Sequence, residues 1–92
     1  MKVNFYASLR QVTGGKSVEL DLPRGTTVRG LLDAVVHRYP ELGDKLFDEE
    51  GTLLGYIHVF INGRDAPYLD RKLATELDES DIVDIFPPVG GG

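Results

Sequence analysis

The sequence predicts an α+β roll, in which a mixed sheet of four to five strands packs on one main helix. Two segments of alternating polarity near the N-terminus predict a hairpin, and a stripe of apolar residues over 28–39 predicts an amphipathic helix. Two further apolar segments, at 56–61 and 82–86, predict later strands. A helix that follows a hairpin must cover one face of the sheet, and a right-handed crossover then places the later strands beside the first.

The hairpin is predicted from two runs in which apolar and polar residues alternate. The first run is typical of a half-buried strand whose side chains at four positions face the helix: Val3, Phe5, Ala7 and Leu9. Residues 13–16 form a turn signal, and the alternation resumes with apolar residues at 18, 20 and 22. Pro23 and Gly25 then end the second strand.

The main helix is predicted from apolar residues that recur every three or four positions: Val28, Leu31, Leu32, Val35, Val36 and Tyr39. Thr26 or Thr27 supplies a hydroxyl that accepts a hydrogen bond from the first turn. Pro40 disfavours helical geometry at the residue before it and ends the helix there. Gly30 weakens the helix by about 1 kcal/mol relative to alanine, so we expect a close approach between helix and sheet at this position.

The second half of the chain is predicted to supply the remaining strands. Residues 41–55 predict a short irregular connection, held down by its apolar side chains. A strand at 56–61 ends at Asn62-Gly63, the strongest short hairpin signal. Leu69, Leu73 and Leu77 predict a helical turn, and residues 78–81 predict a tight turn before the last strand at 82–86.

Composition and charge exclude several classes of function. Ninety-two residues suit one domain, and fifteen acids against ten bases give a net charge of −5. This charge argues against binding to nucleic acid or to anionic membranes. The chain has no cysteine, which excludes disulfides, thiolate metal sites and a cysteine nucleophile and fits a reducing compartment. Its start lacks the apolar core of a signal peptide and no run is long enough to span a membrane, so we expect a cytoplasmic protein.

The sequence offers no catalytic or metal-binding constellation. His37 and His58 lie on different predicted elements, so surface positions are favoured over metal ligation. Residues 48–50 are acidic but lack the ligand spacing of a calcium loop. No nucleophile is paired with a base, so we expect no catalytic residues, no metal and no bound cofactor. Five acids between Glu76 and Asp84 form either a solvated turn or a surface that steers the chain toward a basic partner.

The C-terminus has an unusual composition, because an apolar strand runs into two prolines, a valine and three glycines. We therefore divide the chain into a domain, residues 1–86, and a flexible tail, residues 87–92. Pro87 and Pro88 favour an extended backbone, and glycine lets the chain pass through a narrow channel. Six residues reach at most roughly 20 Å. The alternatives are a frayed terminus and a proline-rich ligand.

Several motifs, in one order over nearly the whole chain, resemble those of a known family. They are K-V-N-F-Y-A-S-L-R at 2–10, P-x-G-T-T-V-x-x-L-L at 23–32, V-F-I-N-G-R at 59–64, and L-D-E-S-D-I-V-D-I-F-P-P-V at 77–89 with the glycines after it. Together they resemble the ubiquitin-like sulfur carriers, above all the small subunit of molybdopterin synthase. The most specific piece is the F-P-P-V-x-G-G ending. The resemblance implies a β-grasp fold, like that of ubiquitin.

The resemblance also implies a chemical role for the tail. A carboxylate is a poor electrophile, so an E1-like adenylating enzyme would use ATP to activate Gly92, next to Gly91. A sulfur donor, such as a cysteine desulfurase or a rhodanese, would then displace AMP and leave a C-terminal thiocarboxylate. The large subunit of molybdopterin synthase would accept this sulfur for a pterin precursor. The tail residues before the terminal pair would lie in the partner's channel: Pro87, Pro88, Val89 and Gly90.

The β-grasp sheet that the resemblance implies predicts a docking surface. In such a sheet the first and last strands are adjacent and the third lies beside the last. The alternation then places four apolar side chains on the open face, where Phe86 faces solvent: Tyr6, Phe60, Ile82 and Phe86. Exposed apolar patches of this kind mark partner sites. The alternative is that residues 41–55 cover part of the patch.

Two other functions share the adenylation step and stay open. One is a ubiquitin-like modifier whose Gly92 forms isopeptide bonds with protein lysines, and the other is a sulfur carrier for tRNA thiolation or another sulfur pathway. Residues 42–55 make the chain longer than compact bacterial members of the family. This insertion resembles archaeal-type relatives, some of which are attached to proteins.

Overall fold

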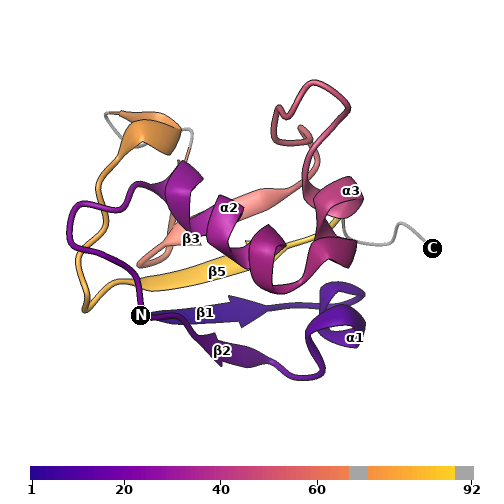
Figure 1. The fold of residues 1–92 in the computed structure, drawn as a ribbon, viewed down its shortest axis with the longest axis horizontal. Helices are drawn as coiled ribbons and strands as arrows, with labels where there is room; N and C mark the ends of the chain where they lie inside the picture. The colour runs from indigo at the N-terminus through magenta and orange to yellow at the C-terminus, as the bar shows by residue number, and fades with distance from the viewer. Residues whose placement is uncertain (67–70, 89–92) are drawn as a thin grey trace.

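A five-stranded mixed sheet with one long helix across it forms the fold in this computed structural model, which describes residues 1–66 and 71–88 (Figure 1). The elements in chain order are β1 (Lys2–Phe5), α1 (Leu9–Thr13), β2 (Ser17–Glu19), α2 (Val28–Arg38), η1 (Pro40–Leu42), α3 (Gly43–Leu46), β3 (His58–Ile61), β4 (Arg64–Asp65), η3 (Lys72–Ala74) and β5 (Ile82–Phe86). The predicted α+β roll is confirmed, and it is a β-grasp fold.

The sheet has the strand order β2-β1-β5-β3-β4, with the last strand at its centre. β5 runs parallel to β1 and antiparallel to β3, whereas β1–β2 and β3–β4 are antiparallel hairpins. The predicted neighbours of the last strand are therefore confirmed. Helix α2 lies across one face of this sheet (Figure 1). Its buried side chains meet those of the strands in one core: Val28, Leu31, Leu32 and Val35 with Val3, Phe5, Val59, Val83 and Ile85.

The first strand is shorter than the sequence predicts. β1 ends at Phe5, and Ala7 is exposed with a left-handed backbone (φ 52°), so Ala7 does not face the helix. Leu9 is buried as expected, but it begins the short helix α1, which ends at Gly14 in the left-handed conformation. Apolar residues at 9 and 12 suit one face of a helix as well as the alternation suits a strand, and the glycine C-cap favours the helix.

Helix α2 has the predicted cap and the predicted end. The Thr27 hydroxyl accepts a hydrogen bond from the Gly30 N–H at 3.1 Å, and Tyr39 is the C-cap directly before Pro40. The predicted reason for Gly30 is wrong, because a Cβ at this position would meet no residue of the sheet. It would lie 3.1 Å from Thr26 Cγ2 and 3.4 Å from Thr27 Oγ1, so glycine leaves room for the capping turn itself.

Residues 41–55 are more regular than predicted. They contain η1, whose first residue is Pro40, then α3, and then a β-bridge between Phe47 and Leu53. Leu42 and Leu46 are fully buried in the core, so this insertion is anchored by its apolar side chains, as expected.

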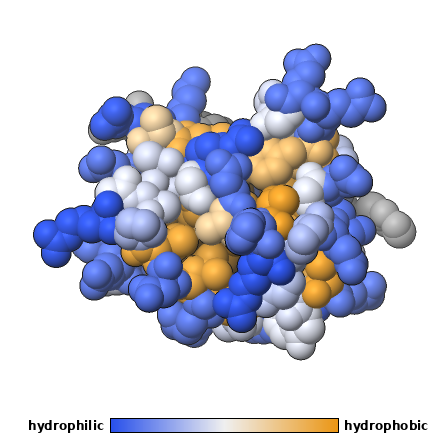
Figure 2. Space-filling view, viewed as in Figure 1, coloured by the Kyte–Doolittle hydropathy of each residue, from blue (hydrophilic) through white to orange (hydrophobic). Residues whose placement is uncertain are grey.

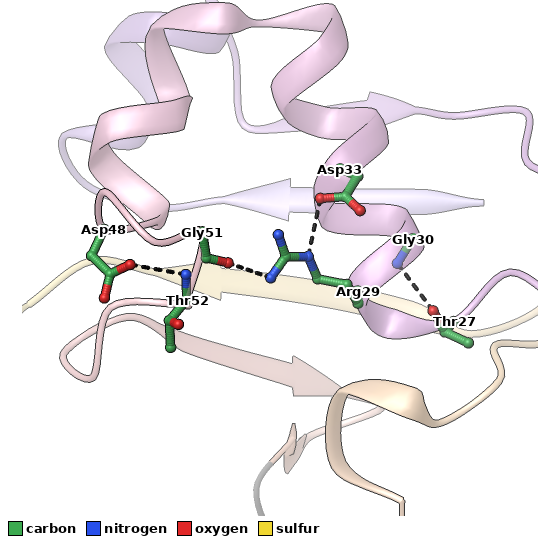
Figure 3. A network of polar contacts seen from close by, with 7 residues as sticks. All are labelled: Thr27, Arg29, Gly30, Asp33, Asp48, Gly51 and Thr52. Carbon is green, nitrogen blue, oxygen red and sulfur yellow. Dashed lines mark hydrogen bonds and ion pairs between the residues drawn. The ribbon is translucent and has the colours of Figure 1, made fainter.

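Arg29 ties the insertion to helix α2 (Figure 3). Its guanidinium donates to the carbonyl of Gly51 and to Asp33 Oδ1 (3.1 Å), and it lies 4.2 Å from the ring centroid of Phe47. On the insertion side, Asp48 Oδ1 accepts the N–H groups of residues 50 and 52 at 2.9 and 3.0 Å, which closes the turn. The acidic segment 48–50 is therefore a turn, and within residues 1–66 and 71–88 no metal-binding cluster of His, Cys, Asp or Glu occurs.

The two turns predicted in the second half are present. Asn62 and Gly63 both have positive φ (52° and 85°), the geometry of a two-residue hairpin between β3 and β4. Before β5, the Asp81 carboxylate accepts the N–H of Asp78 at 2.8 Å. A short η3 helix includes Leu73, whereas Leu69 lies outside the described residues.

On the side of the molecule that carries α2, hydrophilic side chains separate several small apolar areas (Figure 2). None of the helices in the described parts of the chain is long and apolar enough to cross a bilayer.

Candidate functional site at the root of the C-terminal tail

Strand β5 presents one set of side chains to the core and another to the opposite face of the sheet. Val83 and Ile85 are fully buried beneath α2. Ile82, Asp84 and Phe86 alternate with them and therefore project from the face that α2 does not cover, here called the outer face. The predicted orientation of the last strand is confirmed.

Three aromatic rings gather on the outer face where β5 ends, and we call them the tail-root cluster: Tyr6, Phe60 and Phe86. Tyr6 stacks on Phe86 with ring centroids 4.1 Å apart and planes at 13°. Phe60 meets Phe86 edge to face at 5.4 Å and 88°. Phe86 therefore points outward as predicted, but its ring is half-buried rather than fully exposed to solvent, because Tyr6 stacks on it and Phe60 meets it edge to face.

The fourth predicted patch residue, Ile82, lies apart from this cluster. It is 44% exposed and projects from the same face. Asp84 separates it from Phe86, so that the two apolar residues are about 13 Å apart along the strand. The structure thus brings together three of the four residues.

A chain of hydrogen bonds crosses the outer face and holds Asp84. Ser17 Oγ donates to Asn4 Oδ1 at 2.6 Å, and Asn4 Nδ2 donates to Asp84 Oδ1 at 2.9 Å. The Tyr6 hydroxyl donates to the same Oδ1 at 2.9 Å. The carboxylate therefore links the tail-root cluster to β1 and β2.

The contact with Asp84 raises the pKa of Tyr6 above its ordinary value of 10.0. The hydrogen bond to Asp84 is the main cause, followed by burial and by the negative charge of Asp84, while the charge of Arg10 opposes them. Arg10 and Lys16 place their cationic groups 5.3 and 5.8 Å from the centroid of the Tyr6 ring, within the range of cation–π attraction.

This raised pKa predicts how stability depends on pH. Since the folded state holds the Tyr6 proton more tightly, its contribution to stability is fully present below the unfolded pKa of about 10 and is lost as pH rises through the folded pKa. Tyr6→Phe keeps the stacked ring and removes the hydroxyl, so we expect it to lower the free energy of unfolding by about 1 kcal/mol at neutral pH.

Urea unfolding of both proteins across a series of pH values tests this expectation. The difference in unfolding free energy between wild type and Tyr6→Phe should be constant up to about pH 9 and should fall above about pH 10. The other tyrosines are present in both proteins, so their contributions cancel in this difference. A difference that stays unchanged into the alkaline range would contradict the assignment.

The chain leaves the sheet between two concave surfaces. Pro87 is buried and Pro88 is exposed, so the packed part of the chain extends one residue past the predicted boundary at Phe86. On the outer face is a cavity of about 490 Å³, here called the tail-root cavity, lined by His58, Phe60, Gly63, Asp65, Asp84, Phe86 and Pro87. None of residues 41–55 lines it, so the insertion leaves this part of the predicted patch open.

The insertion instead helps to form the second concave surface, on the other side of the tail. This hollow of about 230 Å³ is lined by both prolines and by Ser8, Leu9, Asp44, Lys45, Tyr56 and Ile57. Tyr56 is 53% exposed there. Tyr56 was not among the predicted site residues, because the pattern of residues 56–61 predicted a strand that includes it, whereas β3 begins at His58.

The remaining predicted site residues have different outcomes. Val89, Gly90, Gly91 and Gly92 lie outside the described residues, so the flexible tail and their roles stay predictions. His58 is exposed, as expected, and lies at the rim of the tail-root cavity. Asp65 and Asp84 were not predicted as neighbours of the aromatic rings. The signal was present in the Asn62-Gly63 turn, which sets the register that places residue 65 opposite residue 60.

Comparisons with known proteins agree with the fold. The model of the ThiS family matches residues 3–92. The chain belongs to the ThiS family of ubiquitin-like sulfur carriers. This family match covers the glycine-rich end as well as the sheet, so the predicted resemblance to the ubiquitin-like sulfur carriers is confirmed.

Three relatives show the range of this family. Small archaeal modifier protein 3 from Haloferax volcanii is 36% identical over 100% of this chain and 98% of its own. The crystal structure of SAMP1 from Haloferax volcanii superposes with a TM-score of 0.87 at 33% identity, covering 99% of this chain and 97% of that one. The molybdopterin synthase sulfur carrier subunit of Dictyostelium discoideum is 28% identical over 99% of this chain and 94% of its own.

Proposed function

We propose that this ThiS-family chain carries sulfur on its C-terminus. A partner E1-like enzyme uses ATP to convert the Gly92 carboxylate into an acyl-adenylate, with release of pyrophosphate. The terminal sulfur of a donor persulfide then attacks the acyl carbon, and AMP leaves, which gives an acyl disulfide between the chain and the donor. A thiol reductant cleaves the S–S bond of this intermediate and releases the donor as part of a new disulfide, so that the transferred sulfur stays on the acyl carbon. The resulting C-terminal thiocarboxylate is the group that the protein delivers. The chain supplies no catalytic side chain for these steps, and the partner enzymes bind the ATP.

The observation that carries this proposal is the position of the tail. The central strand β5 ends at the tail-root cluster, and the chain then passes between two concave surfaces before the residues that end in glycine. A partner enzyme can bind the aromatic rings and the two concave surfaces while the C-terminal end of this chain extends into the partner's active site. Aromatic side chains are enriched among the residues that contribute most to binding at protein interfaces.

The acceptor that we propose is a pterin precursor, bound by the large subunit of a molybdopterin synthase. The Dictyostelium relative, which is named as a subunit of that synthase, supports this acceptor. We propose that a cysteine desulfurase or a rhodanese supplies the sulfur and that the protein works with these partners in the cytoplasm.

The second candidate is conjugation of Gly92 to protein lysines. The observation that favours it is the higher identity of the chain to the Haloferax modifier protein, 36%, than to the synthase subunit, 28%. None of residues 41–55 lines the tail-root cavity, so the insertion does not distinguish the two candidates on that side of the tail. Both functions require the same first step, adenylation of the free C-terminus.

Mass spectrometry of the protein recovered from its own cells separates the two candidates. A free terminus in which sulfur replaces one oxygen supports the carrier. Peptides in which Gly92 is joined to a lysine side chain support the modifier, and both species together would show a dual role. A terminus that carries neither group in growing cells, and no adenylate with the cognate enzyme, would refute both.

A further inference from the structure

The tail-root cavity combines aromatic walls with two carboxylates. Phe60 and Phe86 meet at 88° and form the apolar part, and Asp65 and Asp84 line the same space. In the described chain, no lysine or arginine lines this cavity. An acidic cavity with aromatic walls has the chemistry to hold a cationic side chain.

The register of the sheet sets the spacing of the two carboxylates. Phe60 on β3 is paired with Asp65 on β4 and with Asp84 on β5, so one aromatic residue lies between the two acids. Strands are about 4.8 Å apart, which places the backbones of the acids about 10 Å apart. A flat group over the Phe60 ring can therefore donate hydrogen bonds to both sides.

Both carboxylates have oxygens that can accept a further donor. Asp65 Oδ2 lies 3.2 Å from His58 Nδ1, whereas its Oδ1 is buried and has no hydrogen-bond partner within residues 1–66 and 71–88. The two side-chain hydrogen bonds that reach Asp84 in the described chain both end on Oδ1. Asp65 Oδ1 has almost no exposed surface, so a ligand in the cavity would reach Asp65 through Oδ2 and Asp84 through its own Oδ2, since a carboxylate oxygen can accept more than one hydrogen bond.

We infer that the tail-root cavity receives an arginine side chain of the adenylating enzyme. This inference rests on the proposed function and names a contact by which that partner recognises the chain. Arginine fits better than lysine, because the guanidinium is planar, stacks on aromatic rings and presents five donors in a fixed fork. A lysine ammonium is a compact point charge and cannot stack on Phe60 while it reaches both acids. The net charge of −5 adds a general attraction for a basic surface.

Asp65→Asn tests the contact, since it removes the charge and keeps the shape. In ATP–pyrophosphate exchange with the cognate adenylating enzyme, we expect the KM for this variant to rise about 10- to 100-fold. This increase corresponds to the loss of one charge-assisted hydrogen bond. The kcat should change less than about twofold, because the terminus itself is unaltered. Asp84→Asn should act in the same direction, although it also alters the bond to Tyr6.

Glu79→Gln is the matched control. It removes the same charge from an exposed residue just before β5 that does not line the cavity, so its KM should remain within about twofold of wild type. A thermal melt of each variant shows whether the domain still folds. If Asp65→Asn and Glu79→Gln behave alike while the wild type is adenylated normally, the arginine contact is wrong and the proposed function stands.

A second measurement needs no partner enzyme. N-acetyl-arginine amide, added to the free protein, should shift the amide resonances of residues 65 and 84, and N-acetyl-lysine amide should shift them less. Asp65→Asn should abolish the arginine effect. Equal shifts with both compounds, or no shift at these residues, would overturn the inference, whatever the exchange assay shows. Failure of the wild type in the exchange assay would instead count against the proposed function.

Discussion

Removal of Gly92, or extension of the chain beyond it, should abolish adenylation of this protein. An extension leaves no α-carboxylate at the position where ATP is attacked. A deletion draws the carboxylate back by one residue, about 3.5 Å of extended chain. Since a displacement of about 1 Å can lower a rate by about 100-fold, we expect the deletion to reduce exchange by at least that factor.

ATP–pyrophosphate exchange with the cognate enzyme measures this loss, and a thermal melt supplies the control. Both variants should melt like the wild type, because the core ends at Ile85 and Pro87 is the last buried residue of the described chain. Cleavage of a C-terminal tag directly after Gly92 should restore exchange. Undiminished exchange by the tagged protein would show that the terminus is not the activated group.

The features predicted correctly from sequence are those for which local chemistry and burial agree. Val83 and Ile85 alternate with polar and outward-facing residues, and both are fully buried. Thr27 precedes the apolar stripe and caps α2. Asn62-Gly63 forms the tight turn that its positive φ angles require. At each of these positions the local sequence pattern was compatible with only one local structure.

The features that were missed depend on contacts between distant residues or on two competing patterns. Leu9 suits both a strand that continues from Phe5 and a helix that begins anew, and the sequence alone favoured the strand. Gly30 is explained by the volume of Thr26 and Thr27, which only the folded capping turn brings together. The acids of the tail-root cavity belong to different strands, so their neighbourhood follows from sheet register rather than from spacing along the chain.

Val83→Asp should leave the domain unfolded. Val83 has no exposed surface and lies on the central strand, between β1 and β3. An ionised carboxylate at this position would be buried without a partner, at a cost of several kcal/mol. A domain of this size is stable by only about 5–15 kcal/mol, and the lost valine contacts add to the penalty. Circular dichroism should show no cooperative thermal transition.

Phe86→Asp on the same strand should fold and should fail in docking. The variant loses ring contacts with Tyr6 and Phe60, each worth about 0.5–1.5 kcal/mol, and places a second acid beside Asp84. We therefore expect a destabilisation of about 1–3 kcal/mol, which lowers the Tm by roughly 5–20 °C. Loss of an aromatic anchor from an interface typically weakens binding by about 2 kcal/mol or more.

The two variants together decide whether the outer face is the docking surface. A titration against the adenylating enzyme, at a temperature where Phe86→Asp is fully folded, should show affinity at least about 30-fold weaker than that of the wild type. Phe86→Leu is the graded control, because it keeps an apolar side chain and introduces no charge, so it should bind with intermediate affinity. Unchanged affinity of a folded Phe86→Asp would exclude the tail-root cluster from the interface. If Phe86→Asp instead lacks a cooperative thermal transition, as we expect of Val83→Asp, the side chain of Phe86 is required for folding and the cluster belongs to the core.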